Sequence, residues 1–241
     1  ACPEGAIEQI DPFGFITDHD RCTVCGRCVD ACFTGARSIV GRTMGLDAIM
    51  REIERDRSYF DESGGGVTFS GGEPLLQADA VVELARRCHK AGIRTALETA
   101  GHCSWKTLER VIREMDLVFI DLKHIDSEAH RAYTGVQLDL ILPNIRKAAE
   151  VASRLVVRIP VVPGVNATPE IMERMFRFLA EETQVKQVQL LPFHRLGMTK
   201  YEGLGRHYAM GDTENMSKEE CEPFAEQGRK LGLTVQVGAE G

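Results

Sequence analysis

The sequence predicts an α/β fold in which parallel strands alternate with helices to form a whole or partial barrel, preceded by a small cysteine-rich segment. Short apolar runs alternate with amphipathic helix patterns along most of the chain. One strand follows another at about 25–35 residues, the spacing of parallel βαβ units, and five or six such units follow in series. The length of 241 residues fits one domain of ordinary size or a barrel with a small insert.

The expected strands are Val67–Phe69, Arg94–Leu97, Leu117–Ile120, Leu155–Ile159, Gln187–Leu191 and Thr234–Val237. Helix patterns cover residues 46–57, 104–114, 140–152, 169–182 and 217–230. A further helix follows the first of these strands, because Val81, Leu84, Ala85 and Cys88 recur on one stripe while charged residues lie between them. The last helix opens on Ser217-Lys-Glu-Glu220, which predicts a capping box.

Composition excludes several classes of protein. An apolar share of 43% with 27% charged residues is globular rather than disordered or collagen-like. The charge balance of 29 Lys+Arg against 36 Asp+Glu (29 − 36 = −7) argues against a general nucleic-acid binder. No apolar run of about 18 residues predicts a membrane span, and no signal peptide opens the chain. We expect a cytoplasmic protein.

The cysteine spacing predicts iron–sulfur ligation. Cys22, Cys25, Cys28 and Cys32 form the run C-x2-C-x2-C-x3-C, in which three thiolates bind one cubane and the fourth binds a neighbouring cluster. Cys2 precedes a proline, as the last ligand of such a run does, so its own run would begin upstream of Ala1. We therefore expect one 4Fe–4S cluster held by Cys22, Cys25, Cys28 and Cys2, with Cys32 assigned to a second cluster.

Zinc and a disulfide framework are the alternatives for these cysteines. Zinc sites rarely use four cysteines packed so tightly, and a secreted disulfide scaffold conflicts with the large core. Phe33 follows Cys32 where ferredoxins usually have proline, and proline is not a ligand. We assign Cys88 to the core and Cys221 to a surface or interhelix position. A pocket position is the less favoured alternative for Cys103.

A glycine-rich turn follows the first of these strands as Ser70-Gly71-Gly72-Glu73-Pro74. Two glycines allow a ligand to approach the backbone closely, and Pro74 keeps Glu73 extended. The turn offers carbonyl oxygens and a carboxylate, which suit an ammonium group better than a phosphate. Most Gly-Gly turns are only turns, so this signal is weak alone.

Polar residues also end two other strands, where a βα barrel gathers its functional groups. Glu98 and Thr99 end one strand, and Asp121 and Lys123 end the next. Residues two apart in a strand share a face, so Asp121 and Lys123 should face the barrel interior while Leu122 faces away. The alternative is that Asp121 and Lys123 form an ion pair with a purely structural function.

Arg158 lies in an apolar strand and therefore needs an anionic partner, because an unpaired buried charge costs several kcal/mol. His194 lies just past the strand that ends at Leu191, and this position favours a place in the pocket. Together these groups predict a polar cup of both charge signs that suits a zwitterion such as an amino acid. The other histidines are expected at the surface, namely His19, His89, His102, His124, His130 and His207.

With these motifs in place, the sequence resembles the glycyl-radical-enzyme activating enzymes, a branch of the radical S-adenosylmethionine (SAM) superfamily. The resemblance runs along essentially the whole chain. It rests on the motifs CTVCGRCVDAC, SGGGVTFSGGEPLLQ, ALETAGH, FIDLKHID, HRAYTGV, VVRIPVVPGVN and LLPFHRLGMTKYEGLG. The combination is highly specific, although SGGE alone would not be.

The resemblance implies a fold and a reaction. The fold is a partial (β/α)6 radical SAM barrel with a ferredoxin-like 4Fe–4S insert after its first strand. A further 4Fe–4S cluster, held by a C-x3-C-x2-C loop, binds SAM through an open iron. One electron then cleaves SAM to methionine and a 5′-deoxyadenosyl radical, which takes a hydrogen atom from a backbone glycine of a partner enzyme. The insert clusters would relay electrons from a flavodoxin or ferredoxin.

The resemblance also implies roles for residues at the strand ends. Gly71, Gly72 and Glu73 would meet the amino group of the methionine moiety of SAM, and Lys123 would meet its carboxylate. The same assignment makes Lys123 one of three expected catalytic residues.

Arg158 and His194 are the other two. His194 would contact the ribose and adenosine side together with Asp121, and Arg158 would reach the ligand from across the barrel. Leu122 belongs to the cofactor-binding set as the residue between Asp121 and Lys123. In some relatives the positions of Glu98, Thr99 and Asp121 hold a monovalent cation.

The C-x3-C-x2-C segment is missing from this sequence, since Cys25, Cys28 and Cys32 have the reverse spacing. We therefore expect an N-terminally truncated activating enzyme that lacks its first barrel strand and does not cleave SAM alone. Residues 1–40 would form the incomplete insert and residues 41–241 the barrel. The rival interpretations are a non-catalytic electron-transfer protein on a barrel scaffold, a degenerate paralogue that only binds the partner, and another radical SAM branch.

Overall fold

The computed structural model describes residues 1–12, 14–204 and 206–238, and the chain divides into two compact units. The first, here called the cysteine unit, combines Ala1–Met44 with His194–Glu214. The second, here called the sheet unit, combines Gly45–Phe193 with Asn215–Gly241. The assignment of residues 1–40 to an insert and 41–241 to a barrel stays a prediction.

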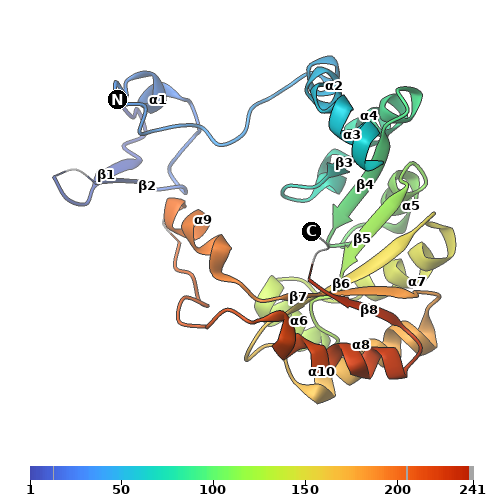
Figure 1. Ribbon diagram of the computed structural model, residues 1–241. Helices are drawn as coiled ribbons and strands as arrows, with labels where there is room; N and C mark the ends of the chain where they lie inside the picture. Colours follow the sequence, from blue (N-terminus) through green and yellow to red (C-terminus); the bar gives the residue numbers. More distant parts are fainter. Residues whose placement is uncertain (13, 205, 239–241) are drawn as a thin grey trace. The chain divides into compact units, whose positions relative to one another are not determined.

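A six-stranded parallel sheet organises the sheet unit, with its strands side by side in chain order (Figure 1). The strands are β3 (Gly66–Phe69), β4 (Arg94–Thr99), β5 (Leu117–Asp121), β6 (Leu155–Val161), β7 (Gln187–Pro192) and β8 (Thr234–Val237). Each pairs in parallel with the next, so all carboxyl ends lie along one edge. The α/β prediction is confirmed, and its finer form, a partial (β/α)6 barrel lacking one strand, stays a prediction.

Helices connect the strands of the sheet, as parallel pairing requires. Helices α2 (Leu46–Arg55) and α3 (Arg57–Ser63) precede β3. The connecting helices are α4 (Ala78–Lys90), α5 (Trp105–Ile112), α6 (Ser127–Thr134), α7 (Ile141–Val151), α8 (Pro169–Glu182) and α10 (Lys218–Lys230). The helix expected at 169–182 is confirmed, and so is the capping box of Ser217 and Glu220. The helix expected at 46–57 ends at Arg55, and Asp56 separates it from α3. Among the described residues no helix is long and apolar enough to cross a membrane.

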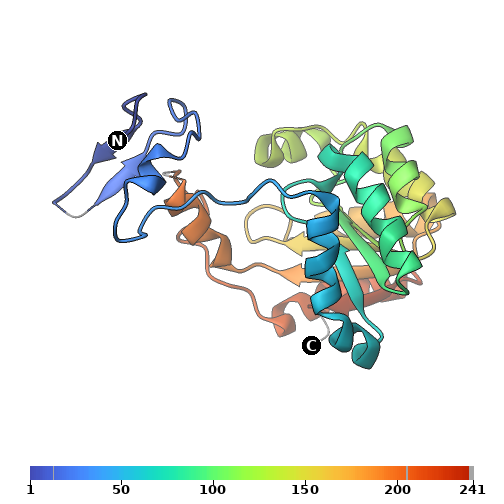
Figure 2. The ribbon, with the colours of Figure 1, turned by 90° about the horizontal axis from the view of Figure 1, so that it is seen from above.

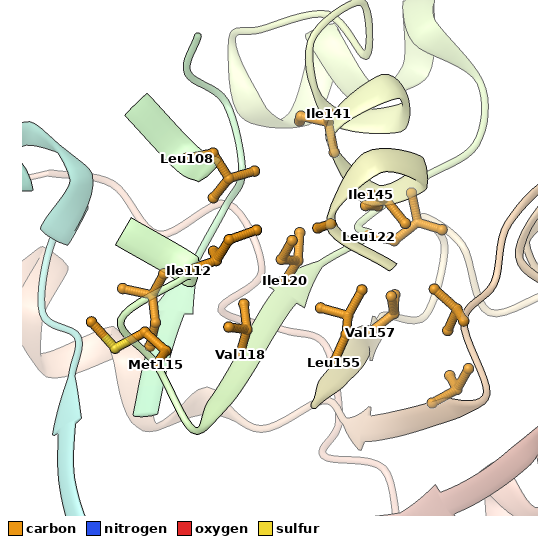
Figure 3. Packing of buried hydrophobic residues seen from close by; sticks show 14 of the residues in the cluster. Leu108, Ile112, Met115, Val118, Ile120, Leu122, Ile141, Ile145, Leu155 and Val157 are labelled. Carbon is orange, nitrogen blue, oxygen red and sulfur yellow. The ribbon is translucent and has the colours of Figure 1, made fainter. Parts of the chain in front are cut away.

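The hydrophobic core lies between one face of the sheet and the helices. Figure 1 shows α5, α7, α8 and α10 along that face, and Figure 2 shows α4 and α5 in green beside each other. Val118, Ile120 and Val157 of the strands pack with Leu108 and Ile145 of the helices (Figure 3). Because side chains alternate along a strand, the residues between these apolar positions lie on the opposite face of the sheet.

Short elements of the cysteine unit were not predicted. Strand β1 (Ile7–Gln9) pairs antiparallel with β2 (Phe15–Thr17), and helix α1 (Arg27–Asp30) follows. The second segment of the unit contributes the 3₁₀ turn η2 (Arg195–Gly197) and helix α9 (Met198–Gly203). Elements of three to six residues are too short to show a hydrophobic period, so the sequence alone did not reveal them.

Two surface expectations are wrong, and a third residue keeps only one of its two alternatives. His124 and His130 are buried, at 4% and 2% exposure. The Nδ1–H of His130 donates to the carbonyl of Val136 at 2.7 Å, and burial lowers the pKa of the ring. Cys221 is buried on α10, so only its interhelix alternative survives, and burial raises the pKa of its thiol to about 11. Cys88 lies in the core as expected.

We predict that Gly66→Ala destabilises the sheet unit, because a Cβ at this position would lie 2.0 Å from the carbonyl oxygen of Arg94 on β4. Overpacking of this kind typically costs about 1–3 kcal/mol of unfolding free energy. Urea denaturation monitored by circular dichroism measures the loss. Gly45→Ala is the control, since its Cβ would meet no atom within 4 Å. Equal losses in the two variants would contradict the steric argument.

Candidate functional site

The carboxyl ends of the strands surround a cavity of about 380 Å³, here called the strand-end pocket. It lies where a parallel α/β sheet gathers its functional groups. Its lining residues are Ser70, Gly71, Gly72, Glu73, Glu98, Thr99, Ala100, Asp121, Lys123, Arg158 and Leu191. Residues that belong to or directly follow β3, β4, β5, β6 and β7 thus share one cavity, although more than 120 positions separate the first from the last.

Two residues expected in the cofactor site do not line this pocket. Leu122 is fully buried in the hydrophobic core, where Figure 3 shows it among the packed side chains. Its side chain lies on the opposite face because it alternates with Asp121 and Lys123, and its place in the cofactor-binding set stays a prediction. His194 belongs to the cysteine unit, where it precedes η2 in an extended conformation. Its contact with a ligand of the pocket stays a prediction.

Two lining residues were not predicted, Ala100 and Leu191. Ser70 was considered only as part of its turn. Ala100 follows Thr99 directly, and Leu191 lies two positions after Gln189 on β7. The period-two rule applied along β7 would have placed Leu191 on the polar face of the sheet.

Lys123 and Asp121 form an ion pair inside the pocket. The Lys123 Nζ lies 2.8 Å from Asp121 Oδ2, and both side chains are about one third exposed. Asp121 and Lys123 share one face of the sheet, as the sequence predicted. They form an ion pair and also line the pocket, so the two alternatives do not exclude each other. An ammonium group has three donors, so one contact to Asp121 leaves two N–H groups of Lys123 for a ligand.

Arg158 has the anionic partner that its burial requires. Its Nη1 lies 2.6 Å from Glu98 Oε1, and its side chain is 18% exposed. Its Nε donates to Gln189 Oε1 at 2.9 Å, and the guanidinium stacks 3.6 Å from the ring centre of Phe119. Glu98 lines the same pocket, so the pair places both charge signs at its wall.

Glu73 uses its carboxylate to hold the glycine-rich turn against the end of β4. Its Oε1 accepts from the Thr99 hydroxyl at 2.8 Å and from the Leu75 N–H at 3.1 Å. Its Oε2 accepts from the Ala100 N–H at 2.9 Å. The backbone of Glu73 is extended before Pro74, as expected. Glu73 therefore has a structural function in addition to its place in the pocket lining.

The pocket has an unbalanced set of charges. Lys123 and Arg158 face three carboxylates, those of Glu73, Glu98 and Asp121, which gives 2 − 3 = −1. Gly71 and Gly72 leave open space beside the backbone, since a Cβ at either position would meet no atom within 4 Å. The pocket is suited to a ligand with a net positive charge that also contains a carboxylate.

The cysteine unit contains a second candidate site. Cys2, Cys22, Cys25 and Cys28 line one cavity of about 300 Å³, whereas Cys32 lines a different cavity of about 640 Å³ together with Cys2 and Cys28. All eight cysteines are free thiols, so the disulfide alternative is not supported. No three acidic, histidine or cysteine side chains of the described residues converge on a point where a metal ion would fit.

Two backbone N–H groups near these cysteines donate hydrogen bonds to cysteine sulfur atoms. The N–H groups of Ala6 and Val24 donate to the sulfurs of Cys2 and Cys22 at 3.3 and 3.4 Å. Val24 adopts a φ of 54°, a left-handed conformation that is costly for a β-branched residue and recurs at functional loops. Hydrogen bonding from the Thr34 hydroxyl lowers the pKa of Cys32 to about 7.

Cys103 does not line the strand-end pocket, so its less favoured alternative finds no support. It packs against the core, and burial together with the nearby charge of Glu73 raises the pKa of its thiol to about 11. A neutral thiol of this kind is a poor ligand and a poor nucleophile.

Comparison with known proteins identifies relatives over nearly the whole chain. The radical SAM superfamily profile matches residues 19–179. The 4-hydroxyphenylacetate decarboxylase activating enzyme of Clostridioides difficile is 36% identical, with 99% of this chain and 76% of the relative covered. The (2S)-3-sulfopropanediol dehydratase activating enzyme of Klebsiella oxytoca is 37% identical over 99% of this chain and 77% of its own.

A solved structure shows the same arrangement of the chain. A domain of the pyruvate-formate lyase-activating enzyme from Bacteroides vulgatus superimposes with a TM-score of 0.61 at 32% identity, covering 73% of this chain and 99% of that domain. A radical SAM methyltransferase from Sphaerobacter thermophilus shares the fold at 18% identity, with a TM-score of 0.60 over 87% of this chain and 62% of its own.

We predict that Glu73→Ala lowers the unfolding free energy by about 2–4 kcal/mol, because it leaves the Thr99 hydroxyl and the Ala100 N–H without their acceptor. Chemical denaturation measures the change. Glu62→Ala, on the exposed surface of α3, is the control and should stay within about 0.5 kcal/mol of the parent protein. A Glu73→Ala protein as stable as this control would show that the carboxylate does not hold the turn.

Proposed function

This chain belongs to the glycyl-radical-enzyme activating enzymes of the radical SAM superfamily, and from that membership we propose that its strand-end pocket binds SAM. With SAM and a reduced 4Fe–4S cluster bound, one electron from the cluster would cleave SAM to methionine and a 5′-deoxyadenosyl radical, which would take a hydrogen atom from a backbone glycine of the partner enzyme. The observation that supports the pocket assignment most directly is its charge. SAM has a sulfonium, an ammonium and a carboxylate, which complement a pocket of both signs with one excess negative charge.

In this proposal, different residues of the pocket contact different groups of SAM. Lys123 offers its two remaining N–H groups to the carboxylate, and Arg158 adds a second cation on β6. The backbone of the turn at Gly71 and Gly72, where no Cβ blocks approach, receives the ammonium together with Glu73. A charge-assisted hydrogen bond in a partly buried site contributes about 1.5–3 kcal/mol. We propose Asp121 for the ribose and adenosine side, and His194 stays a candidate for that side from the family resemblance alone.

A monovalent cation beside Glu98, Thr99 and Asp121 is part of the proposal. Each of these oxygens already has a protein partner, since Glu98 pairs with Arg158, Asp121 with Lys123, and Thr99 with Glu73. A carboxylate has about four lone-pair positions, so the cation would use those that these partners leave unoccupied.

The cysteine unit would hold the clusters that relay electrons. Four thiolates around one cavity match the ligand count of a 4Fe–4S cluster, and these are Cys2, Cys22, Cys25 and Cys28. Backbone N–H groups directed at sulfur are a usual feature of such sites. Cys32, which lines the other cavity, is the proposed ligand of a second cluster. We propose a flavodoxin or a ferredoxin as the electron donor.

The proposed partner is a glycyl radical enzyme. The two relatives at 36% and 37% identity are named as activating enzymes of a decarboxylase and a dehydratase. A cytoplasmic location is also proposed, because free thiols intended for clusters persist in a reducing compartment.

We predict that Lys123→Ala weakens SAM binding about tenfold to a hundredfold in the anaerobically reconstituted protein, since it removes a charge-assisted contact worth about 1.5–3 kcal/mol. Isothermal titration calorimetry measures the dissociation constant. Lys90→Ala is the matched control, because Lys90 is exposed at the end of α4 and does not line the pocket. Equal dissociation constants for the two variants would remove Lys123 from the site.

We further predict about one complete 4Fe–4S cluster per chain after anaerobic reconstitution, and its loss in Cys2→Ala. Iron and acid-labile sulfide per chain are the measurements. Cys32→Ala is the matched control and should keep this cluster, because Cys32 does not line the cavity of the other four cysteines. Two complete, stable clusters in the parent protein, or an unchanged iron content in Cys2→Ala, would refute the assignment.

A further inference from the structure

We infer that Gln189 is a positioning residue, which fixes the guanidinium of Arg158 at the wall of the strand-end pocket. The inference rests on the proposed function, because it concerns the same pocket. Gln189 lies on β7 directly beside Arg158 of β6 in the parallel register. It is 8% exposed and does not itself line the pocket, so it acts on a ligand only through another residue.

The side-chain amide of Gln189 has one orientation that satisfies both of its neighbours. Its Oε1 accepts from Arg158 Nε at 2.9 Å, and its Nε2 donates to the Gly238 carbonyl at 3.0 Å. A flipped amide would place two donors against each other on one side and two acceptors on the other. Gly238 is held in turn by its own N–H, which donates to the Leu190 carbonyl at 2.8 Å. The end of β8 therefore fixes the acceptor that Arg158 uses.

The guanidinium of Arg158 is held by three contacts of different kinds. Glu98 pairs with Nη1 at 2.6 Å, Phe119 stacks at 3.6 Å, and Gln189 accepts from Nε. Glu98 lines the pocket and is 39% exposed at its side chain, so a cationic ligand group can compete for it. Phe119 restricts the plane of the guanidinium but not its rotation within that plane. Gln189 sets this rotation and stays out of reach of the ligand.

A preoriented guanidinium binds more tightly than a mobile one, because binding no longer has to restrict a long side chain with several rotatable bonds. Loss of the Gln189 acceptor should therefore reduce affinity for SAM even though Arg158 and Glu98 are intact. The stability of the sheet should fall as well, since the Gly238 carbonyl loses its donor. The two effects can be separated, because only the first depends on Arg158.

The test is a double-mutant cycle between Gln189→Met and Arg158→Met, with SAM dissociation constants measured by calorimetry in the reconstituted protein. Methionine matches glutamine in length and offers neither strong donor nor strong acceptor. We expect Gln189→Met to weaken SAM binding about five- to tenfold in the parent protein. In the Arg158→Met background the same change should have no further effect on affinity. Thermal unfolding is recorded for all four proteins.

The chain supplies a matched control two residues earlier on the same strand. Gln187 Oε1 accepts from Arg154 Nε at 2.8 Å, the same kind of pair at the amino end of the sheet, and neither residue lines the strand-end pocket. Gln187→Met should leave SAM affinity unchanged. A loss of affinity equal to that of Gln189→Met would overturn the inference.

A second variant keeps the inference testable if Gln189→Met does not fold. Gln189→Glu retains an acceptor for Arg158 Nε and places its second oxygen against the Gly238 carbonyl, so we expect a loss of stability while SAM affinity stays within about threefold of the parent value. A loss as large as that of Arg158→Met would overturn the inference, as would additive effects in the cycle. If Arg158→Met itself leaves SAM affinity unchanged, the assignment of Arg158 under the proposed function fails instead, which is a different result.

Discussion

The alternation of side chains along one parallel sheet is the constraint on which the sheet unit depends. Ile120 and Leu122 turn toward the helices and are fully buried, whereas Asp121 and Lys123 between and beyond them line the strand-end pocket. Helices cover one face because its apolar residues must leave water, and the other face keeps the polar groups. Parallel pairing then brings the ends of five strands to one edge. A core and a charged pocket therefore arise from the same strands.

The charged groups of the pocket are paired before any ligand binds. Lys123 has Asp121, Arg158 has Glu98, and the Glu73 carboxylate accepts from three donors. Pairing offsets the cost of keeping charge in a partly buried site, and it also holds each group in one orientation. A ligand of both charge signs, as proposed for this pocket, would replace these existing partners of the charged side chains. Gln189 and the end of β8 support this arrangement from outside the pocket.

The cysteine unit depends on a different principle. Its elements are short, and its exposed apolar side chains, including Phe33 and Val40, show that it buries little hydrophobic surface. A unit with so small a core usually relies on bound metal or covalent cross-links for stability. Four free thiols surround one cavity, and N–H groups donate to two of the sulfurs. This arrangement is suited to bound metal rather than to cross-links. If this unit holds the proposed clusters, ligation and folding would be linked in this part of the chain.

Local patterns in the sequence were enough to predict the strands, most of the helices and the iron–sulfur ligation. Each of these predictions depends on residues close together in the chain. The shared face of Asp121 and Lys123 follows from the same period of two. Only the tertiary structure decided that Glu98 rather than another carboxylate pairs with Arg158, that Glu73 holds Thr99 and Ala100, and that His130 is buried. The contacts of Glu98 and Glu73 join residues dozens of positions apart. Their partners are selected by strand order and register, which no local period in the sequence specifies.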